Sequence, residues 1–203
     1  MVMNSKIVLA STSPRRKELL QNMGIEFEII APSSDESLIS GENPKDYVLR
    51  MASEKACSVS QNLEGNYLVI GADTIVVIDG EILGKPIDLE DARRMLSRIS
   101  GRIHQVLTAF CIARPKNSIL HSEIVDTNVE VKTLEPDEIE GYIKTSEPMD
   151  KAGAYGIQGI GAFMIKGIRG SYTNVVGLPL VEVLEALKIH GAQKQFSGDG
   201  FKK

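Results

Sequence analysis

Two adjacent arginines stand at the expected start of a helix, and they suggest an anion-binding site. Residues 11–16 read Ser-Thr-Ser-Pro-Arg-Arg and follow a short apolar run at 7–10. The first turn of a helix exposes unpaired N–H groups and the positive end of the helix dipole, so it favours anions and disfavours cations. A bound polyanion would explain Arg15 and Arg16 in this place. The alternative is that both guanidinium groups point into water.

A carboxylate, Asp73, is enclosed by two apolar runs, 67–71 and 74–78. Burying it is costly unless it is paired or binds a metal ion. We expect the two runs to be separate strands with Asp73 in the break between them, at a strand end where open α/β sheets place their ligands. The alternative is a turn or capping aspartate. Asp35 and Glu36, in a polar loop, offer a second metal-facing carboxylate, although by themselves they are ordinary loop acids.

Two lysines could add positive charge to such a site. Lys55 shares one helical face with the apolar residues at 48, 52 and 59, so we expect it on or beside the apolar stripe of its helix. The alternative is a lysine whose stem passes the core and whose ammonium reaches water. Lys85 follows the hairpin turn expected at Asp79 and Gly80, and for Lys85 a surface loop position is the alternative.

A glycine-rich segment at 151–161 contains four glycines and the amide side chain of Gln158. This density permits positive φ and close approach of the backbone to a ligand, although a structural loop with tight turns has the same pattern. The glycine order is not the dinucleotide-binding G-x-G-x-x-G, and the sequence holds no P-loop, G-x-S-x-G or H-E-x-x-H motif. An anion site, a carboxylate, extra lysines and a glycine-rich loop together suit a nucleoside triphosphate.

The spacing of apolar residues predicts an α/β fold with a mixed sheet. Helix start and stop signals stand at Pro14, with Ser13 as its expected cap, and Gly24, at Asn43 and Pro44, and at Asp88 and Gly101. The other expected elements are strands at 7–10, 27–31, 103–113 and 119–133 and helices at 136–144 and 181–189. We expect one domain over residues 1–192, with two lobes around a central cleft, and a flexible tail at 193–203.

The composition excludes several classes of protein. Of the 203 residues, 42% are hydrophobic and 25% charged, which excludes a disordered chain. The 23 basic and 27 acidic side chains give a formal charge of −4, which argues against a general nucleic-acid-coating surface. Cys57 and Cys111 form no C-x-x-C pair and the three histidines lack metal-ligand spacing, so we expect neither a zinc site nor a disulfide framework. Without a recognisable signal peptide or membrane span, the chain is expected to be cytoplasmic, with no membrane or nucleic-acid partner.

From residue 7 to about residue 187 the chain resembles the Maf family of nucleoside triphosphate pyrophosphatases. Six blocks carry the resemblance: Ser11–Arg16, Gly71–Thr74, Gly84–Pro86, Ser100–Gly101 with His104–Val106 and Thr108, Asp150–Gly159, and Ser171–Tyr172 with Val176–Pro179. The resemblance implies an elongated, twisted mixed sheet flanked by helices, as in the related ITPases, and a homodimer. It also implies hydrolysis of a nucleoside triphosphate to the monophosphate and pyrophosphate with a divalent cation, Mg²⁺, Mn²⁺ or Co²⁺.

The resemblance also assigns roles by position. Asp73 looks like the proton acceptor, and Glu36 looks like its partner in holding the metal or the attacking water. The implied catalytic set is Asp73, Glu36, Lys55 and Lys85, the metal ligands are Asp73 and Glu36, and the substrate-binding set is Ser11, Arg15, Arg16, Thr74 and Gln158. Among these, Arg16, Thr74 and Gln158 match the branch of the family that prefers dTTP and UTP.

The expected activity is therefore hydrolysis of dTTP and UTP by metal-assisted attack of water on the α-phosphorus. Two alternatives stay open at this stage. One is a house-cleaning pyrophosphatase for modified nucleotides, and the other is a nucleotide-binding regulator of septum formation, the process from which the family takes its name.

Overall fold

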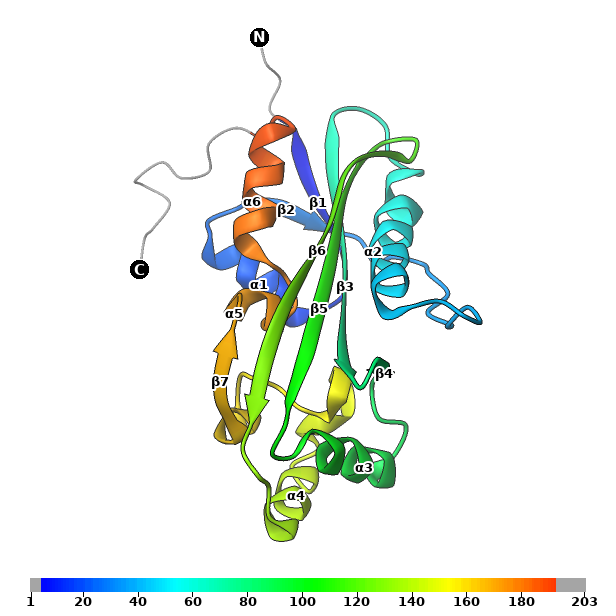
Figure 1. Ribbon diagram of the computed structural model, residues 1–203. Helices are drawn as coiled ribbons and strands as arrows, with labels where there is room; N and C mark the ends of the chain where they lie inside the picture. The colour runs from blue at the N-terminus through cyan, green and yellow to red at the C-terminus, as the bar shows by residue number, and fades with distance from the viewer. Residues whose placement is uncertain (1–4, 193–203) are drawn as a thin grey trace. The chain divides into compact units, whose positions relative to one another are not determined.

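The computed structural model describes residues 5–192, so the tail predicted at 193–203 lies outside the described residues (Figure 1). The strands are β1 (Lys6–Ala10), β2 (Phe27–Ile29), β3 (Tyr67–Ile78), β4 (Glu81–Leu83), β5 (Ile103–Arg114), β6 (Ser118–Val131) and β7 (Ile165–Arg169). The helices are α1 (Pro14–Asn22), α2 (Pro44–Ser60), α3 (Leu89–Ile99), α4 (Pro136–Ile143), α5 (Tyr172–Val176) and α6 (Leu180–Ile189). Within the described part of the chain, no helix is both long enough and apolar enough to span a bilayer.

The strands form one mixed sheet, which confirms the predicted fold class. Their order is β2-β1-β3-β5-β6-β7, with β4 paired to β3. β1 runs parallel to both β2 and β3, whereas β3 with β4 and β6 with β7 are antiparallel pairs. The β3–β4 hairpin turns at Asp79 and Gly80, both of which adopt positive φ, as the sequence predicts for an Asp-Gly turn.

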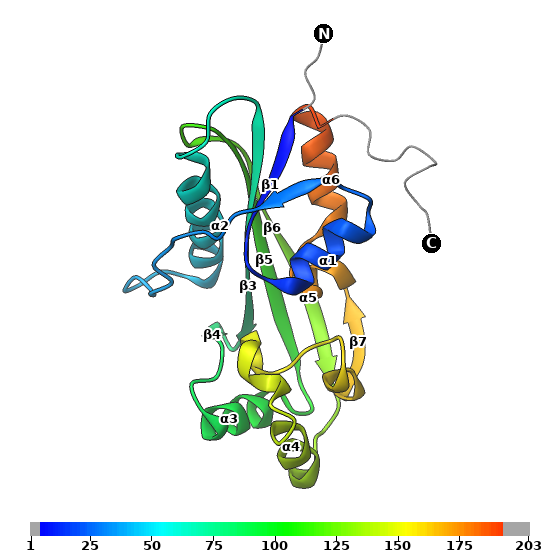
Figure 2. The same ribbon diagram turned by 180° about the vertical axis from the view of Figure 1, so that it is seen from behind.

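The described residues group into two units. The first contains residues up to 73, 108–124 and from 177 on, and the second contains residues 74–107 and 125–176. In the first unit, side chains alternate across β1: Ile7 and Leu9 pack with α1 and α6, whereas Val8 and Ala10 pack with Val59 of α2. Helices therefore cover both faces of the sheet in this unit (Figures 1 and 2).

The second unit has a core of its own. Buried residues of α3 and α4 pack against Val76 of β3 and against Val129 and Val131 of β6. Asp88 begins α3, and its side chain accepts a hydrogen bond from Asp91 N at 2.7 Å, so the predicted cap is confirmed. Gly101 follows the end of α3 with a positive φ of 68°, which explains the glycine there.

The start of α1 differs from the expected cap. Ser13 occupies the N-cap position, but its side chain makes no capping hydrogen bond. The Ser11 hydroxyl instead accepts a hydrogen bond from Ser13 N at 3.2 Å, which places this buried serine at the start of the helix. The first turn contains Arg15 and Arg16 and no acidic residue, as the sequence indicates.

Two expectations about elements are wrong. Residues 67–78 form the single strand β3 without a break, so Asp73 lies inside a strand and not at a strand end. The strand continues through Asp73 because Lys55, from another part of the chain, pairs with the carboxylate and offsets the cost of burying it. Two elements between the glycine-rich segment at 151–161 and the helix expected at 181–189, β7 and α5, were not predicted; β7 is short, ends the sheet and includes Gly167.

Gly71 allows β3 to approach α2 more closely than any other residue would. A Cβ atom on Gly71 would lie 2.4 Å from Ala52 O and Ala56 N, both backbone atoms of α2. Neither atom can move without disturbing the helix, and real Cβ contacts are never so short. Helix and strand are therefore in direct backbone contact beside Lys55 and Asp73, which lie one residue before Ala56 and two residues after Gly71.

Replacing Gly71 by Ala should lower the free energy of unfolding by about 3 kcal/mol, because the added methyl group overpacks a site that cannot relax. Urea denaturation of the purified variant measures this. The control is Gly141→Ala: Gly141 lies inside α4 with open space around its Cβ position, so this change should raise stability by about 0.5 kcal/mol. Equal effects of the two substitutions would contradict the close contact between β3 and α2.

Candidate active site

A buried lysine lies at the centre of the polar residues in the first unit. The Lys55 ammonium is 2.7 Å from Asp73 Oδ1 and 2.7 Å from Glu36 Oε1. Lys55 comes from α2, Asp73 from β3 and Glu36 from the segment between β2 and α2. Three separate parts of the chain therefore bring their charges together at one nitrogen atom.

The burial of Lys55 excludes the alternative in which its ammonium reaches water. Its side chain is only 9% exposed, so the ammonium does not extend past the core into water. An ammonium removed from water needs opposite charge and hydrogen bonds, and two carboxylates supply both. The side chain of Asp73 is 14% exposed and that of Glu36 is 58% exposed, so the group opens to solvent on the Glu36 side. One positive and two negative charges leave the trio with a formal charge of −1.

Arg16 belongs to the same polar group and does not simply point into water. Its Nε donates a hydrogen bond to Gly177 O at 2.7 Å, and its Nη1 donates to Ser11 Oγ at 3.4 Å. Burial lowers the pKa of Arg16, while the negative charges of Asp73 and Glu36 act in the opposite direction. Ser11, Arg16, Glu36, Lys55 and Asp73 thus share one charged region. Arg15 is half-buried, and its charge also acts on Arg16.

The remaining predicted site residues fall in the second unit. Thr74 follows Asp73 directly on β3, and Lys85 is exposed in the segment after β4. Gly153 N donates a hydrogen bond to Gly84 O at 3.0 Å, so the segment that carries Lys85 lies beside the start of the glycine-rich segment. Gly153 has a positive φ of 68°, and a Cβ there would touch Val76 at 2.9 Å, which explains this glycine structurally.

The loop around Gln158 is fixed at both ends. Tyr142 Oη accepts a hydrogen bond from Gly156 N at 3.2 Å and donates one to Glu147 Oε1 at 2.9 Å. The Glu147 carboxylate also accepts hydrogen bonds from Ile160 N and Gly161 N, each at 3.0 Å. Half-buried Gln158 lies between these two attachments. Tyr142 and Glu147 were not predicted from the sequence, since nothing in their residue types or spacing indicates contacts with a distant loop.

A family model described as Maf-like protein matches residues 6–190 of the chain. The chain belongs to this family. The dTTP/UTP pyrophosphatase of Geotalea uraniireducens is 52% identical over 188 residues, 93% of this chain and 96% of that protein. The dTTP/UTP pyrophosphatase of Geobacter metallireducens is 53% identical over 190 residues, 93% of this chain and 98% of that protein.

A solved structure, that of the Staphylococcus aureus Ham1 protein, resembles this Maf-like chain with a TM-score of 0.43 and 15% sequence identity. The matched region covers 79% of this chain and 80% of the Ham1 chain.

The donor atoms present in this Maf-like chain fit a small, hard divalent cation. Within residues 5–192, no three or more His, Cys, Asp or Glu side chains gather in a way that could hold a metal ion. Asp73 and Glu36 nevertheless contact the same nitrogen atom, so their carboxylates lie close together. Magnesium sites commonly use one or two carboxylates and complete their shell with water and substrate phosphates. Two carboxylates without softer ligands match that pattern.

His104 is a buried titratable residue of the second unit. Its Nε2 lies 2.7 Å from Tyr155 Oη, while its buried Nδ1 has no hydrogen-bond partner among the described residues. Burial lowers the pKa of His104 to about 4 and raises the pKa of Tyr155. The imidazole is therefore neutral at pH 7, and it fixes Tyr155 just before the loop that carries Gln158.

The low pKa of His104 makes the protein less stable in weak acid. Between pH 6.5 and about 4 the unfolded chain binds a proton at His104 and the folded chain does not. The free energy of unfolding therefore decreases as the pH is lowered through this range. This contribution should reach about 2 kcal/mol at pH 4.5. Urea denaturation at pH 7.5, 5.5 and 4.5 should show it in the wild type and not in His104→Gln, whereas equal pH dependence in both proteins would refute it.

Proposed function

We propose that this protein hydrolyses dTTP and UTP to the nucleoside monophosphate and pyrophosphate. The observation that carries the proposal is the Lys55 ammonium held between Asp73 and Glu36, with Arg16 in the same charged region. Its similarity to proteins named dTTP/UTP pyrophosphatases, at about half of all positions, supports the substrate. A triphosphate needs positive charge and hydrogen-bond donors, and this region offers guanidinium, ammonium and hydroxyl groups.

The phosphates would be bound by Ser11, Arg15, Arg16, Lys55 and Lys85. Arg16 already donates to Ser11 and to the Gly177 carbonyl, so its guanidinium is oriented before a ligand arrives. Fixed donors of this kind stabilise the negative charge that develops on the phosphate oxygens as the bond breaks. The Lys55 ammonium is buried, and its electrostatic effect on the phosphates is stronger there than it would be in bulk water.

Asp73 would orient the attacking water and accept its proton. The water oxygen forms a bond to the α-phosphorus, the bond from the α-phosphorus to the bridging oxygen of the β-phosphate breaks, and pyrophosphate leaves with that electron pair. The proton passes from water to a carboxylate oxygen of Asp73 and from there to solvent. Glu36, more exposed than Asp73, would help to hold the water in line with the leaving group.

Asp73 and Glu36 would also hold the divalent cation that the family implies. When bound, Mg²⁺, Mn²⁺ or Co²⁺ supplies positive charge to the phosphate oxygens and lowers the pKa of water. The contacts of both carboxylates with Lys55 keep their oxygen atoms close together before the cation arrives.

The nucleobase would be recognised by Gln158, with Arg16 and Thr74 as further contributors to substrate choice. An amide side chain both donates and accepts hydrogen bonds, which suits the donor and acceptor on the edge of uracil or thymine. The hydrogen bonds from Tyr142 and Glu147 at the two ends of the loop limit the positions that Gln158 can take.

Replacing Asp73 by Asn should reduce pyrophosphate release from dTTP at least 100-fold, because the amide cannot accept the proton from water, and loss of a general base typically costs about 10²–10⁴-fold. The fold should persist, as shown by an unchanged far-UV circular dichroism spectrum. The matched control is Asp79→Asn in the exposed β3–β4 turn, which should keep full activity. Near-normal turnover by Asp73→Asn would contradict the role of Asp73.

Replacing Gln158 by Glu should reduce kcat/KM for dTTP and UTP about 10-fold or more relative to CTP, because a carboxylate accepts hydrogen bonds but donates none. Pyrophosphate release from a panel of canonical and modified triphosphates measures this. Gln21→Glu on the exposed face of α1 is the control and should leave the order of substrates unchanged. A panel in which modified nucleotides exceed dTTP and UTP would favour a house-cleaning role.

A further inference from the structure

Glu36 lies in a segment without helix or strand. Residues 30–43 connect β2 to α2, and Glu36 is in the first half of this connection. Its side chain is 58% exposed, yet its carboxylate stays at the Lys55 ammonium. An exposed loop loses much conformational entropy when one of its side chains is held in place, so other contacts must restrict its backbone.

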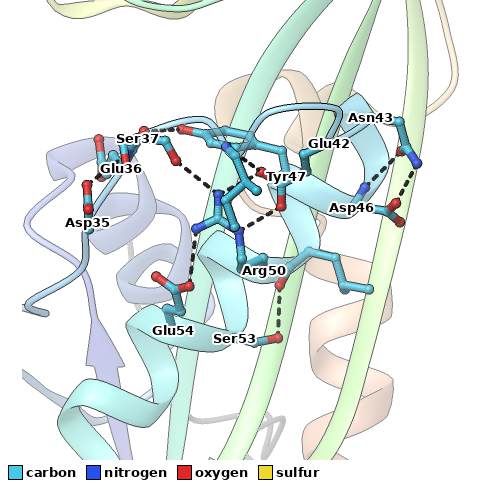
Figure 3. A network of polar contacts seen from close by, with 12 residues as sticks. Asp35, Glu36, Ser37, Glu42, Asn43, Asp46, Tyr47, Arg50, Ser53 and Glu54 are labelled. Atoms are coloured by element: carbon cyan, nitrogen blue, oxygen red, sulfur yellow. Dashed lines mark hydrogen bonds and ion pairs between the residues drawn. The ribbon is translucent and has the colours of Figure 1, made fainter.

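Two side chains of α2 bind consecutive carbonyl groups of this segment. Tyr47 Oη donates a hydrogen bond to Glu36 O at 3.0 Å, and Arg50 Nη2 donates one to Ser37 O at 3.0 Å. The backbone of Glu36 and its neighbour is therefore attached to α2 directly. Figure 3 shows these residues gathered at the start of the helix.

Arg50 also holds the far end of the segment. Its Nε and Nη2 donate to the two carboxylate oxygens of Glu42, each at 2.7 Å, and Glu42 Oε2 accepts a further hydrogen bond from Ile39 N at 3.3 Å. The side chains of Arg50 and Glu42 are 22% and 9% exposed, so much of this pair is removed from water. Hydrogen bonds to Glu42 raise the pKa of Arg50, and the same hydrogen bonds lower the pKa of Glu42. A two-pronged pair of this kind fixes orientation as well as distance.

The donors themselves are fixed on the helix. The guanidinium of Arg50 lies 5.5 Å from the centre of the Tyr47 ring and contacts Glu54 one turn later at 3.2 Å. Asn43 caps the start of α2 by accepting hydrogen bonds from Lys45 N and Asp46 N. The same helix carries Lys55, so the anchor of the loop and the partner of Glu36 belong to one rigid element.

We propose that Arg50 is a positioning residue, which acts with Tyr47 to hold the Glu36 carboxylate at Lys55 and Asp73. It does so through Ser37 O, through Glu42 and through the hydrogen bond between Tyr47 and Glu36 O. This proposal rests on the proposed function, because it assigns Arg50 an effect on the pyrophosphatase reaction through Glu36.

The first test uses the free protein, without nucleotide or metal. Hydrogen exchange of the backbone amides of residues 36–42 should become at least about 10-fold faster in Arg50→Met and in Tyr47→Phe, while amides of β1 and β3 keep their rates. The control is Arg94→Met: Arg94 forms an ion pair with Asp91 on α3, and its side chain is 58% exposed. Unchanged exchange in residues 36–42 of both test variants would overturn the anchoring.

The second test measures dTTP hydrolysis in a double-mutant cycle. Arg50→Met should lower kcat about 10- to 100-fold in the wild-type background, since a misplaced catalytic group costs that much. In the Glu36→Gln background the same change should have less than a twofold effect, because Arg50 acts through Glu36. Arg50→Lys tests the role without removing the charge: one ammonium cannot bind Ser37 O and both Glu42 oxygens, so kcat should fall here too.

A full effect of Arg50→Met in the Glu36→Gln background would overturn the proposal, because Arg50 would then act independently of Glu36. Faster exchange in residues 36–42 with unchanged kcat would also overturn it. A wild-type protein that released no pyrophosphate from any triphosphate would refute the proposed function instead, and the exchange rates would still decide whether Arg50 and Tyr47 hold this segment.

Discussion

A lysine ammonium that leaves water must find opposite charge, and this requirement organises the first unit. Lys55 lies on the buried face of α2, which is mostly apolar, so its charged partners have to come from other parts of the chain. One partner, Asp73, comes from the middle of β3, whose residues are mostly apolar, and the other, Glu36, comes from an irregular loop. Strand, helix and loop are thus fixed relative to one another around a single nitrogen atom.

The backbone serves the same constraint. Without a side chain at Gly71, β3 and α2 touch through their main chains, and this short separation brings Asp73 within reach of Lys55. A larger residue at position 71 would push β3 away from α2. The Lys55 ammonium and the Asp73 carboxylate would then be less completely paired. The absence of a side chain at position 71 therefore determines how closely Lys55 and Asp73 can approach each other.

The sequence predicts those elements whose signals are local. Asn43 and Asp88 cap their helices as expected, and the Asp79–Gly80 turn closes its hairpin, because each signal acts within a few residues. Asp73 is the opposite case. A charged residue between apolar runs favours a break, and only a lysine 18 positions earlier in the chain makes a continuous strand acceptable. Patterns within a short window cannot show such a partner.

The same distinction applies to the candidate site. Arg16, Lys55 and Asp73 could be predicted because a charge in an unfavourable local setting is visible in the sequence. Tyr47, Arg50, Tyr142 and Glu147 could not, because they act on backbone carbonyl and amide groups of distant loops. Any residue type presents those backbone groups, so neither the side chains nor their spacing marks the contact.

The anchoring of residues 36–42 separates this connection into a constrained part and a free part. Contacts hold Glu36, Ser37 and Glu42, whereas Leu38 is 60% exposed and Gly41 has open space around its Cβ position. Lengthening a loop costs little, roughly 0.6 kcal/mol for each doubling. An epitope or a fluorescent reporter inserted at Leu38 or Gly41 would therefore lie close to the candidate site and leave the hydrogen bonds from α2 to Glu36, Ser37 and Glu42 intact.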